Sequence, residues 1–218
     1  MRNTRGFCNA LAWGAYTLCF SSAVLAQNAA EDRLDQLLMG VETLSADVLQ
    51  LIVESDGGVL EESDIRMYLM RPDGFYWETL NPFPELVVTD GETLWNYQPD
   101  LEQLVVEDWD SSQSELAAQL LSGETAQLKS DYLIEQTSAE LANNIEFRLI
   151  PRAADSVYSS ITISFQQEVL DAIHLSNKNG QQTLWQFQQV QRNMPLDASL
   201  FQFEAPPGIE VVNNSSRP

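Results

Sequence analysis

Residues Ile65–Trp109, IRMYLMRPDGFYWETLNPFPELVVTDGETLWNYQPDLEQLVVEDW, alternate short apolar runs with turn signals. The runs are rich in Val, Leu, Tyr and Trp, and the signals are Asn81-Pro82, Asp90-Gly91 and Pro99-Asp100. Runs of this length and composition favour β-strands, and Pro and Asp-Gly steps are typical of the turns between them. The stretch therefore predicts a meander of four or five antiparallel strands.

The alternation of polar and apolar residues continues on both sides of this meander. It predicts strands over residues 45–54, 59–70, 131–136, 146–150, 160–166, 170–176, 182–191 and 209–212. Such alternation is typical of a sheet covered on one face. About ten or eleven sequential antiparallel strands form a sandwich or a barrel, closed or nearly so. We expect residues 27–212 to form one domain and residues 213–218 to form a flexible tail.

Two segments carry a helical pattern instead. Residues 30–44 have apolar side chains at helical spacing, and residues 111–123 begin with a capping sequence and end at a glycine. The expected apolar stripes are Leu34, Leu37, Leu38, Val41 and Leu44 in the first helix and Leu116, Leu120 and Leu121 in the second. We expect these helices to cover an opening of the sheet as a lid.

The first 26 residues have the pattern of a secretory signal peptide. Arg2 and Arg5 precede a mostly apolar segment, and Val24-Leu25-Ala26 supplies small residues for cleavage before about Gln27. A membrane anchor is the alternative, but Asn, Gly and Ser interrupt the segment. No other apolar run reaches the ~20 residues of a membrane span. The pattern therefore predicts an exported protein.

Composition excludes several classes of partner and site. The chain has 11 basic and 32 acidic residues and a net charge of −21. This sign excludes nucleic acid and disfavours adsorption to an anionic membrane. Solubility is the simplest account of the charge. Both cysteines, Cys8 and Cys19, lie inside the predicted signal peptide, so we expect neither a disulfide nor a thiolate metal site after export.

Patterns for catalysis and metal binding are weak. His174 is the only histidine, and its position between Ile173 and Leu175 assigns it to the polar face of a strand. The sequence contains no nucleophile elbow, phosphate loop or dinucleotide fingerprint. Asp108–Ser112 resembles a calcium loop but lacks the Gly and the closing Glu of such loops. We expect no enzyme activity, metal or cofactor, although composition leaves a paired-acid glycosidase open.

Large apolar side chains recur at alternate positions of the expected strands. A packed core is the simpler interpretation, and an apolar cavity for a ligand is the sharper one. Acyl chains suit a wide or incompletely closed barrel, because each buried methylene contributes ~0.8 kcal/mol. The residues assigned to an acyl-chain cavity are Phe75, Trp77, Trp95, Tyr97, Leu104, Val106, Ile161, Ile163, Trp185 and Phe187.

Short motifs spread over the chain occur in a characteristic order. They are Arg71–Trp77 (RPDGFYW), Val88–Gly91 (VTDG), Thr93–Tyr97 (TLWNY), Leu200–Phe203 (LFQF) and Pro206–Ile209 (PPGI). In this combination they resemble the periplasmic lipoprotein carriers of Gram-negative bacteria, the LolA family. The resemblance covers essentially all of the chain after the signal peptide.

The resemblance implies a mainly β fold, an incomplete antiparallel β-barrel with a helical lid over an apolar cavity. Arg71 matches the latch residue of the family, which hydrogen-bonds to lid backbone in the closed state. Such bonds to a charged group contribute ~1.5–3 kcal/mol each, enough to hold a lid and weak enough to release it. Phe75 matches a position near the barrel mouth, and Trp77 matches one in the cavity wall. A surface ion pair at a strand end is the alternative role for Arg71.

The resemblance also implies a function. Such carriers take acylated lipoproteins from an inner-membrane ABC-type release complex and deliver them to an outer-membrane acceptor of the LolB type. We expect a periplasmic monomer of this kind, which binds no nucleic acid and makes or breaks no covalent bond. The alternatives are a periplasmic module that senses lipoproteins with the same half-barrel and an exported hydrolase.

Overall fold

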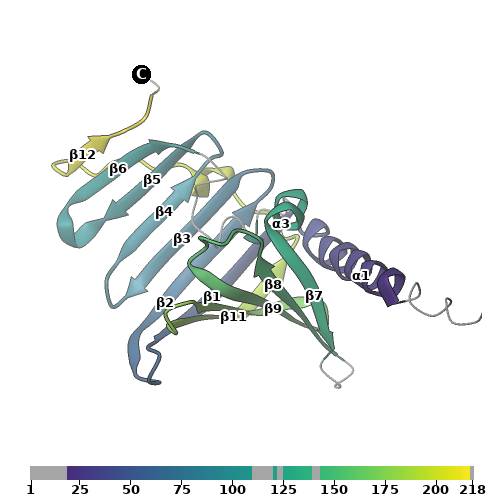
Figure 1. Ribbon diagram of the computed structural model, residues 1–218. Coiled ribbons are helices and arrows are strands. Elements are labelled where there is room, and N and C mark those ends of the chain that lie inside the picture. Colours follow the sequence, from purple (N-terminus) through teal and green to yellow (C-terminus); the bar gives the residue numbers. More distant parts are fainter. Residues whose placement is uncertain (1–18, 110–119, 122–124, 139–142, 217–218) are drawn as a thin grey trace, which may run out of the picture.

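The fold is a strongly curved, open β-sheet with helices on its concave side (Figure 1). The computed structural model describes residues 19–109, 120–121, 125–138 and 143–216. The helices described in full are α1 (Cys19–Met39) and α3 (Thr125–Asp131), with 3-10 turns η1 (Pro99–Leu101) and η2 (Ala198–Phe201). The strands are β1 (Thr43–Val53), β2 (Val59–Met70), β3 (Gly74–Asn81), β4 (Glu85–Thr89), β5 (Thr93–Gln98), β6 (Gln103–Asp108), β7 (Tyr132–Ser138), β8 (Asn144–Pro151), β9 (Tyr158–Gln166), β10 (Val169–Asn177), β11 (Gln182–Arg192) and β12 (Glu210–Asn213).

The described strands form a single 12-stranded sheet in the order β12-β6-β5-β4-β3-β2-β1-β11-β10-β9-β8-β7. Neighbours pair antiparallel, except that β12 pairs parallel with β6. The two edge strands, β12 and β7, are not neighbours in this order, so the barrel is incomplete. The predicted mainly β, incomplete barrel is confirmed, with 12 strands instead of ten or eleven.

The concave face of the sheet carries the core. Val48 of β1 pairs with Ile65 of β2 and with Phe187 of β11, and all three side chains are buried. Because side chains alternate along a strand, this register assigns one face of every neighbouring strand to the interior. The resulting apolar cluster joins the concave face to the helices, and its members include Leu34, Leu37, Leu38, Met67, Phe75, Leu128, Ile134, Phe147, Leu149, Ile161, Ile163, Phe165, Ile173, Leu175 and Trp185.

Helix α1 ends earlier than the sequence pattern predicts. It stops at Met39, a linker follows, and β1 begins at Thr43. Val41 and Leu44 are buried as expected but lie in the linker and in β1, so their assignment to the lid helix is corrected. The apolar spacing resembles a helix past Gly40 because of Leu44, the first inward residue of β1. Leu44 follows Leu37 by seven positions, which is about two helical turns, so a continued helix would also face it inward.

Helix α3 is not predicted by the sequence pattern, which assigns residue 131 to a strand. Thr125–Asp131 instead form a short helix before β7, and Leu128 packs into the core. Of the second predicted helix, residues Leu120 and Leu121 are helical and buried. Leu116 lies outside the described residues.

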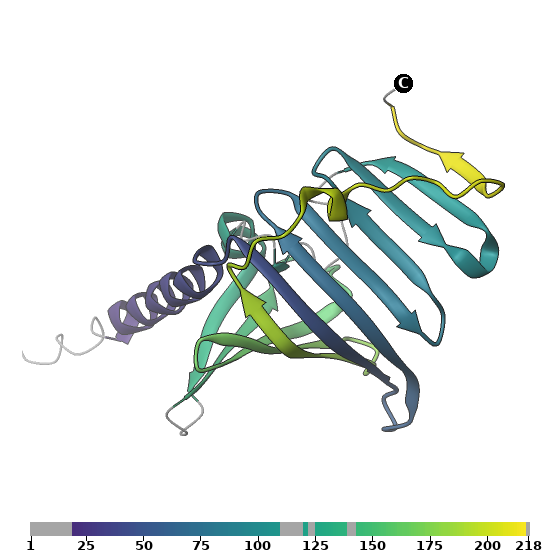
Figure 2. The same ribbon diagram turned by 180° about the vertical axis from the view of Figure 1, so that it is seen from behind.

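The C-terminal segment crosses the convex face of the sheet (Figure 2). After β11 the chain passes through η2, which contacts β3, and reaches β12 at the far edge. Phe201 is buried, and its ring atoms lie 3.1 Å from where a Cβ on Gly74 would stand. Phe203 packs on Tyr97 with ring centroids 5.2 Å apart. The segment therefore covers the convex side of the meander.

Residues after β12 continue its attachment to β6. The backbone N–H of Asn214 donates to the carbonyl of Val106 at 2.8 Å, and that of Ser216 donates to Oδ2 of Asp108 at 3.0 Å. Both donors, Asn214 and Ser216, belong to residues 213–218, which the sequence predicts to form a flexible tail.

We expect Phe201→Ala to destabilise the fold by about 3 kcal/mol, because loss of a buried Phe side chain leaves a cavity between η2 and β3. Phe83→Ala is the matched control, since Phe83 is 69% exposed. Its truncation should change the free energy of unfolding by less than about 0.5 kcal/mol. Urea unfolding followed by tryptophan fluorescence measures both. Equal losses in the two variants would contradict a structural role for the C-terminal segment.

Candidate functional site: a lid over the concave face

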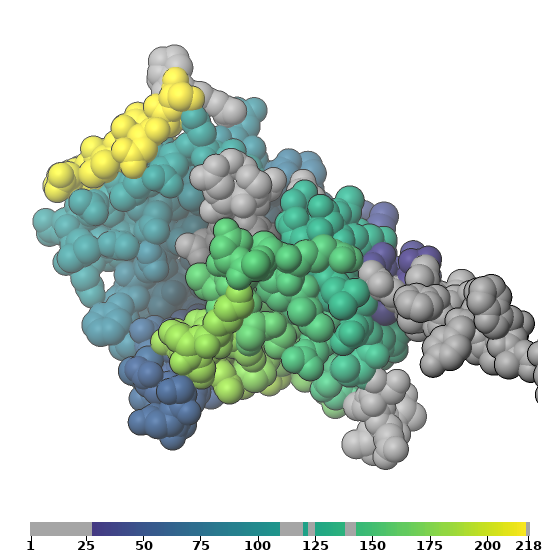
Figure 3. Space-filling model, in the orientation of Figure 1, coloured from purple at the N-terminus to yellow at the C-terminus, as the bar shows by residue number. Residues whose placement is uncertain are grey.

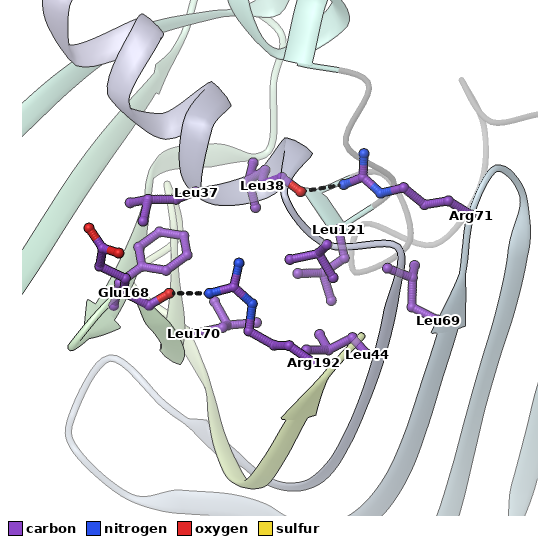
Figure 4. Close-up of a pocket in the computed structure, with 11 residues that line it drawn as sticks. Leu37, Leu38, Leu44, Leu69, Arg71, Leu121, Glu168, Leu170 and Arg192 are labelled. Atoms are coloured by element: carbon purple, nitrogen blue, oxygen red, sulfur yellow. Dashed lines mark hydrogen bonds between the residues drawn. The ribbon is translucent and has the colours of Figure 1, made fainter. Parts of the chain in front are cut away.

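Arg71 joins the sheet to the end of the lid helix (Figure 4). It follows β2, and its Nη2 donates to the carbonyl oxygen of Leu38 at 2.7 Å. Leu38 lies in the last turn of α1, where backbone carbonyls have no partner within the helix. The helix dipole also favours a cation at this end. Arg71 therefore caps α1 and holds it against the sheet.

The guanidinium of Arg71 is only partly satisfied in this position. Loss of water on burial lowers the pKa of Arg71, and the nearby Glu42 carboxylate opposes that shift. The Nε atom is buried and has no acceptor among the described residues. A buried donor without an acceptor costs about 1–3 kcal/mol relative to a hydrated one. This cost offsets part of what the bond from Nη2 to Leu38 contributes.

Two ion pairs hold α1 on the N-terminal side of the bond between Arg71 and Leu38. Arg33 pairs with Glu168, in the turn between β9 and β10, and Lys129 of α3 pairs with Asp35. The hydrogen bond to Asp35 raises the pKa of Lys129, so the lysine stays charged near neutral pH. Arg192 donates to the carbonyl of Glu168 at 2.7 Å and so fixes the turn that carries this carboxylate. The lid therefore has charged attachments to the sheet and to α3.

Asn193 holds the linker between the lid and β1. Its Nδ2 donates to the carbonyl of Gly40 at 2.9 Å, and its Oδ1 accepts the backbone N–H of Glu42 at 2.8 Å. Its own N–H donates to the carbonyl of Thr43 at 2.8 Å. Its φ is +57°, a left-handed conformation in which Asn is enriched. Sequence reasoning missed Asn193 because Glu42 lies 151 positions away in the chain.

Among the described residues, little space remains around the bond between Arg71 and Leu38. The residues around it line a cavity of about 20 Å³, enough for a water molecule and far too small for a hydrocarbon chain. Figure 4 shows its lining: Leu37, Leu38, Val41, Leu44, Leu69, Arg71, Leu121, Phe165, Glu168, Leu170 and Arg192. The described side chains of α1 and of the sheet therefore pack closely around the bond between Arg71 and Leu38.

A larger hollow lies elsewhere on the concave face, with a volume of about 310 Å³. Figure 3 shows this side of the molecule hollowed between the teal and green strands. Trp77 and Trp185 both line the hollow. Their rings pack against each other edge to face, with ring centroids 5.4 Å apart. Its full lining is Gln50, Glu61, Trp77, Thr79, Phe83, Glu85, Val87 and Trp185. The two spaces share no lining residue.

The structure divides the predicted cavity residues between the two faces of the sheet. Those on the concave face are Phe75, Trp77, Ile161, Ile163, Trp185 and Phe187. Trp77 pairs with Val87, and Val87 pairs with Asn96, so Asn96 is concave and Trp95 is convex. Tyr97, Leu104 and Val106 share the convex face with Trp95. We therefore limit the apolar wall to the concave residues and correct the assignment of the other residues.

The described residues considered from the sequence for catalysis or metal binding do not form a reactive group. His174 lies on the convex face, and its Nε2 is 3.1 Å from Oε1 of Gln182, in agreement with the predicted polar position. Over the described ranges, no group of three or more His, Cys, Asp or Glu side chains is placed to hold a metal. Neither α1 nor α3 combines the length and the apolarity that a membrane span needs.

The fold and the site together define a half-barrel with a helical lid over an apolar face. A family model described as "Outer membrane lipoprotein carrier protein LolA" matches residues 39–204. The chain belongs to this family.

Individual relatives agree with the family match. The outer-membrane lipoprotein carrier protein of Chromohalobacter salexigens is 36% identical over 208 residues, which cover 95% of this chain and 98% of that protein. The proteins of the same name from Hahella chejuensis and Pseudomonas aeruginosa (strain UCBPP-PA14) are 33% and 34% identical, over 89% and 94% of this chain and 93% and 96% of theirs. The crystal structure of an uncharacterized conserved protein from Thermus thermophilus has a TM-score of 0.53 at 16% identity, over 85% of this chain and 98% of that one, which supports the fold alone.

We expect Asn193→Gly to loosen the linker without straining the backbone, because glycine adopts a φ of +57° readily. Loss of the side-chain bonds to Gly40 and Glu42 should lower the free energy of opening α1 by about 1–3 kcal/mol. Amide hydrogen exchange in the last turns of α1 should therefore be roughly ten- to hundredfold faster. Gln189→Gly is the control, since Gln189 has a φ of +53° and an exposed side chain. Equal exchange in both variants would exclude this role of Asn193.

Proposed function

We propose that this protein is a periplasmic carrier that shields the acyl chains of lipoproteins between the inner and outer membranes. The observation that carries the proposal is the bond from Arg71 to Leu38, which closes a lid of buried leucines over an apolar face. Membership of the LolA family supports the same function. A carrier of this kind binds and releases its cargo without a chemical step.

Acyl chains enter by exchange with the lid. Leu34, Leu37 and Leu38 are at most 4% exposed in the closed state, so any movement of α1 uncovers apolar surface. An acyl chain covers that surface again, and each of its buried methylenes contributes about 0.8 kcal/mol. The gain and the loss of apolar burial largely cancel. The polar attachments of α1 therefore decide whether the closed or the loaded state is more stable.

The direction of transfer comes from differences in affinity. In this proposal the cargo comes from an inner-membrane ABC-type release complex and passes to an outer-membrane acceptor of the LolB type. Each receiver then binds acyl chains more tightly than its donor. Residues 1–26 serve as the export signal, and the carrier acts as a monomer. The lipoprotein-sensing alternative has no better support, because the relatives are named as carriers.

Native mass spectrometry of the protein purified from the periplasm tests the function. A carrier should be recovered partly with the added mass of a lipoprotein or of an acylated fragment. Recovery of ligand-free protein alone, together with turnover in a screen of esters and glycans, would overturn the proposal in favour of an exported hydrolase.

We expect Arg71→Leu to fold normally and to bind acyl chains about tenfold more tightly, with correspondingly slower release. The variant loses the bond to Leu38 that stabilises the closed, empty state, so a larger fraction of the carrier is open to cargo. The magnitude corresponds to about 1.5 kcal/mol, the lower end for a bond to a charged group, because water replaces the bond on opening. Circular dichroism checks the fold, and dissociation of a labelled triacylated lipopeptide measures release.

Arg66→Leu is the matched control for this prediction. Arg66 pairs with Glu78 at 3.1 Å on the convex face, on the opposite side of the sheet from the lid. Its removal should leave the rate of release unchanged. Delivery at the normal rate by Arg71→Leu would contradict the latch.

A further inference from the structure

The 310 Å³ hollow on the concave face has a chemistry unlike that of the lidded core. The core cluster is apolar, whereas this hollow is lined by two carboxylates, an amide and a hydroxyl beside its aromatic rings. Glu61 comes from β2 and Glu85 from β4, so they approach the hollow from either side of β3. An acyl chain that filled this space would remove water from both carboxylates at considerable cost. The hollow therefore suits a different part of a ligand.

The aromatic wall of the hollow is held in a fixed arrangement. Nε1 of Trp185 donates to Oε1 of Gln50 at 2.7 Å, and the ring of Trp185 lies at 64° to that of Trp77. Phe83, in the turn between β3 and β4, also lines the hollow and is 69% exposed. The faces of such rings attract ammonium and guanidinium groups.

The carboxylates have partners that position them but do not neutralise them. Oε1 of Glu85 accepts from Nδ2 of Asn96 at 3.0 Å and from Nε2 of Gln98 at 3.1 Å. Oε1 of Glu61 accepts from Oγ of Ser63 at 2.7 Å. All of these donors are neutral, and among the described residues neither carboxylate forms an ion pair. Both negative charges therefore remain available to a ligand.

A buried acceptor next to Glu85 also lacks a donor. Oδ1 of Asn96 is buried and accepts no hydrogen bond within the described part of the chain. The amide cannot be reversed to remove this deficit, because Nδ2 is the atom that donates to the Glu85 carboxylate. Asn96 is not among the residues that line the hollow, so its role is to position the Glu85 carboxylate; the two carboxylates and the aromatic rings favour a cation that carries N–H donors.

We propose that the hollow binds a lysine or arginine side chain of the cargo, in the peptide that follows the acylated cysteine. The inference rests on the carrier function proposed above. The acyl chains occupy the space that α1 vacates, and the polar peptide leaves along the concave face past Trp77 and Trp185. Glu61 and Glu85 then pair with its basic side chains. The carrier thereby prefers lipoproteins with a basic segment near the lipid.

The test compares two synthetic lipopeptides, each a triacylated cysteine followed by either lysines or glutamines. The native protein should bind the lysine form more tightly. In the double variant Glu61→Gln, Glu85→Gln, affinity for the lysine form should fall by about three- to tenfold, and affinity for the glutamine form should not change. Glutamine keeps the acceptor oxygens, so the fold is expected to survive. The preference should also weaken at high salt.

Glu62→Gln is the matched control. Glu62 is exposed and adjoins Glu61 on the same strand, but its side chain belongs to the convex face. It should leave both affinities unchanged. Equal binding of the two lipopeptides by the native protein, or an equal loss of both in the double variant, would overturn the inference while leaving the carrier function intact. Failure of the native protein to bind either lipopeptide would overturn both.

Discussion

The hydrogen bond from Arg71 to the carbonyl oxygen of Leu38 ties the sheet to the end of α1, and in the carrier that we propose the closed state depends on it. Apolar packing beneath α1 does not distinguish the lid from cargo, because a hydrocarbon chain offers the concave face similar contacts. A backbone carbonyl at a helix end is different, since a hydrocarbon offers a guanidinium no acceptor. In the proposed carrier, the buried leucines therefore supply most of the burial energy, and the polar contact favours the lid over the cargo.

Two polar atoms in the contacts that hold α1 in place lack hydrogen-bond partners among the described residues. Nε of Arg71 and Oδ1 of Asp35 are buried and have no partners in the described ranges. Each such group costs about 1–3 kcal/mol relative to a hydrated one. These costs offset part of what the latch and the pair between Asp35 and Lys129 contribute. In the proposed carrier, this balance lets α1 close over the empty protein and give way to an acyl chain.

The sequence determined the pattern within each strand but not the relation between strands. Alternation shows that Phe75 and Trp77 share a face, as do Trp95 and Tyr97. Whether these pairs face the same side depends on the register across two turns, residues 81–84 and Asp90-Gly91, which alternation does not contain. In the structure Trp77 aligns through Val87 with Asn96, so the second pair points to the convex side. The strand content could be predicted from the sequence because it depends on local patterns, and the open barrel could be predicted from the family resemblance.

The attachments of the lid show the second limit of sequence reasoning. Arg71 was recognised through resemblance, since a strand-end arginine in an acidic chain equally fits a surface ion pair. Asn193 had no such signal, because its partners belong to a segment 151 positions away. In the fold, Arg71 and Asn193 both act on residues Leu38–Glu42, from β2 and β11 on either side of β1. The C-terminal end of α1 is therefore held from both sides of β1, in addition to the ion pairs that Arg33 and Asp35 make earlier in the helix.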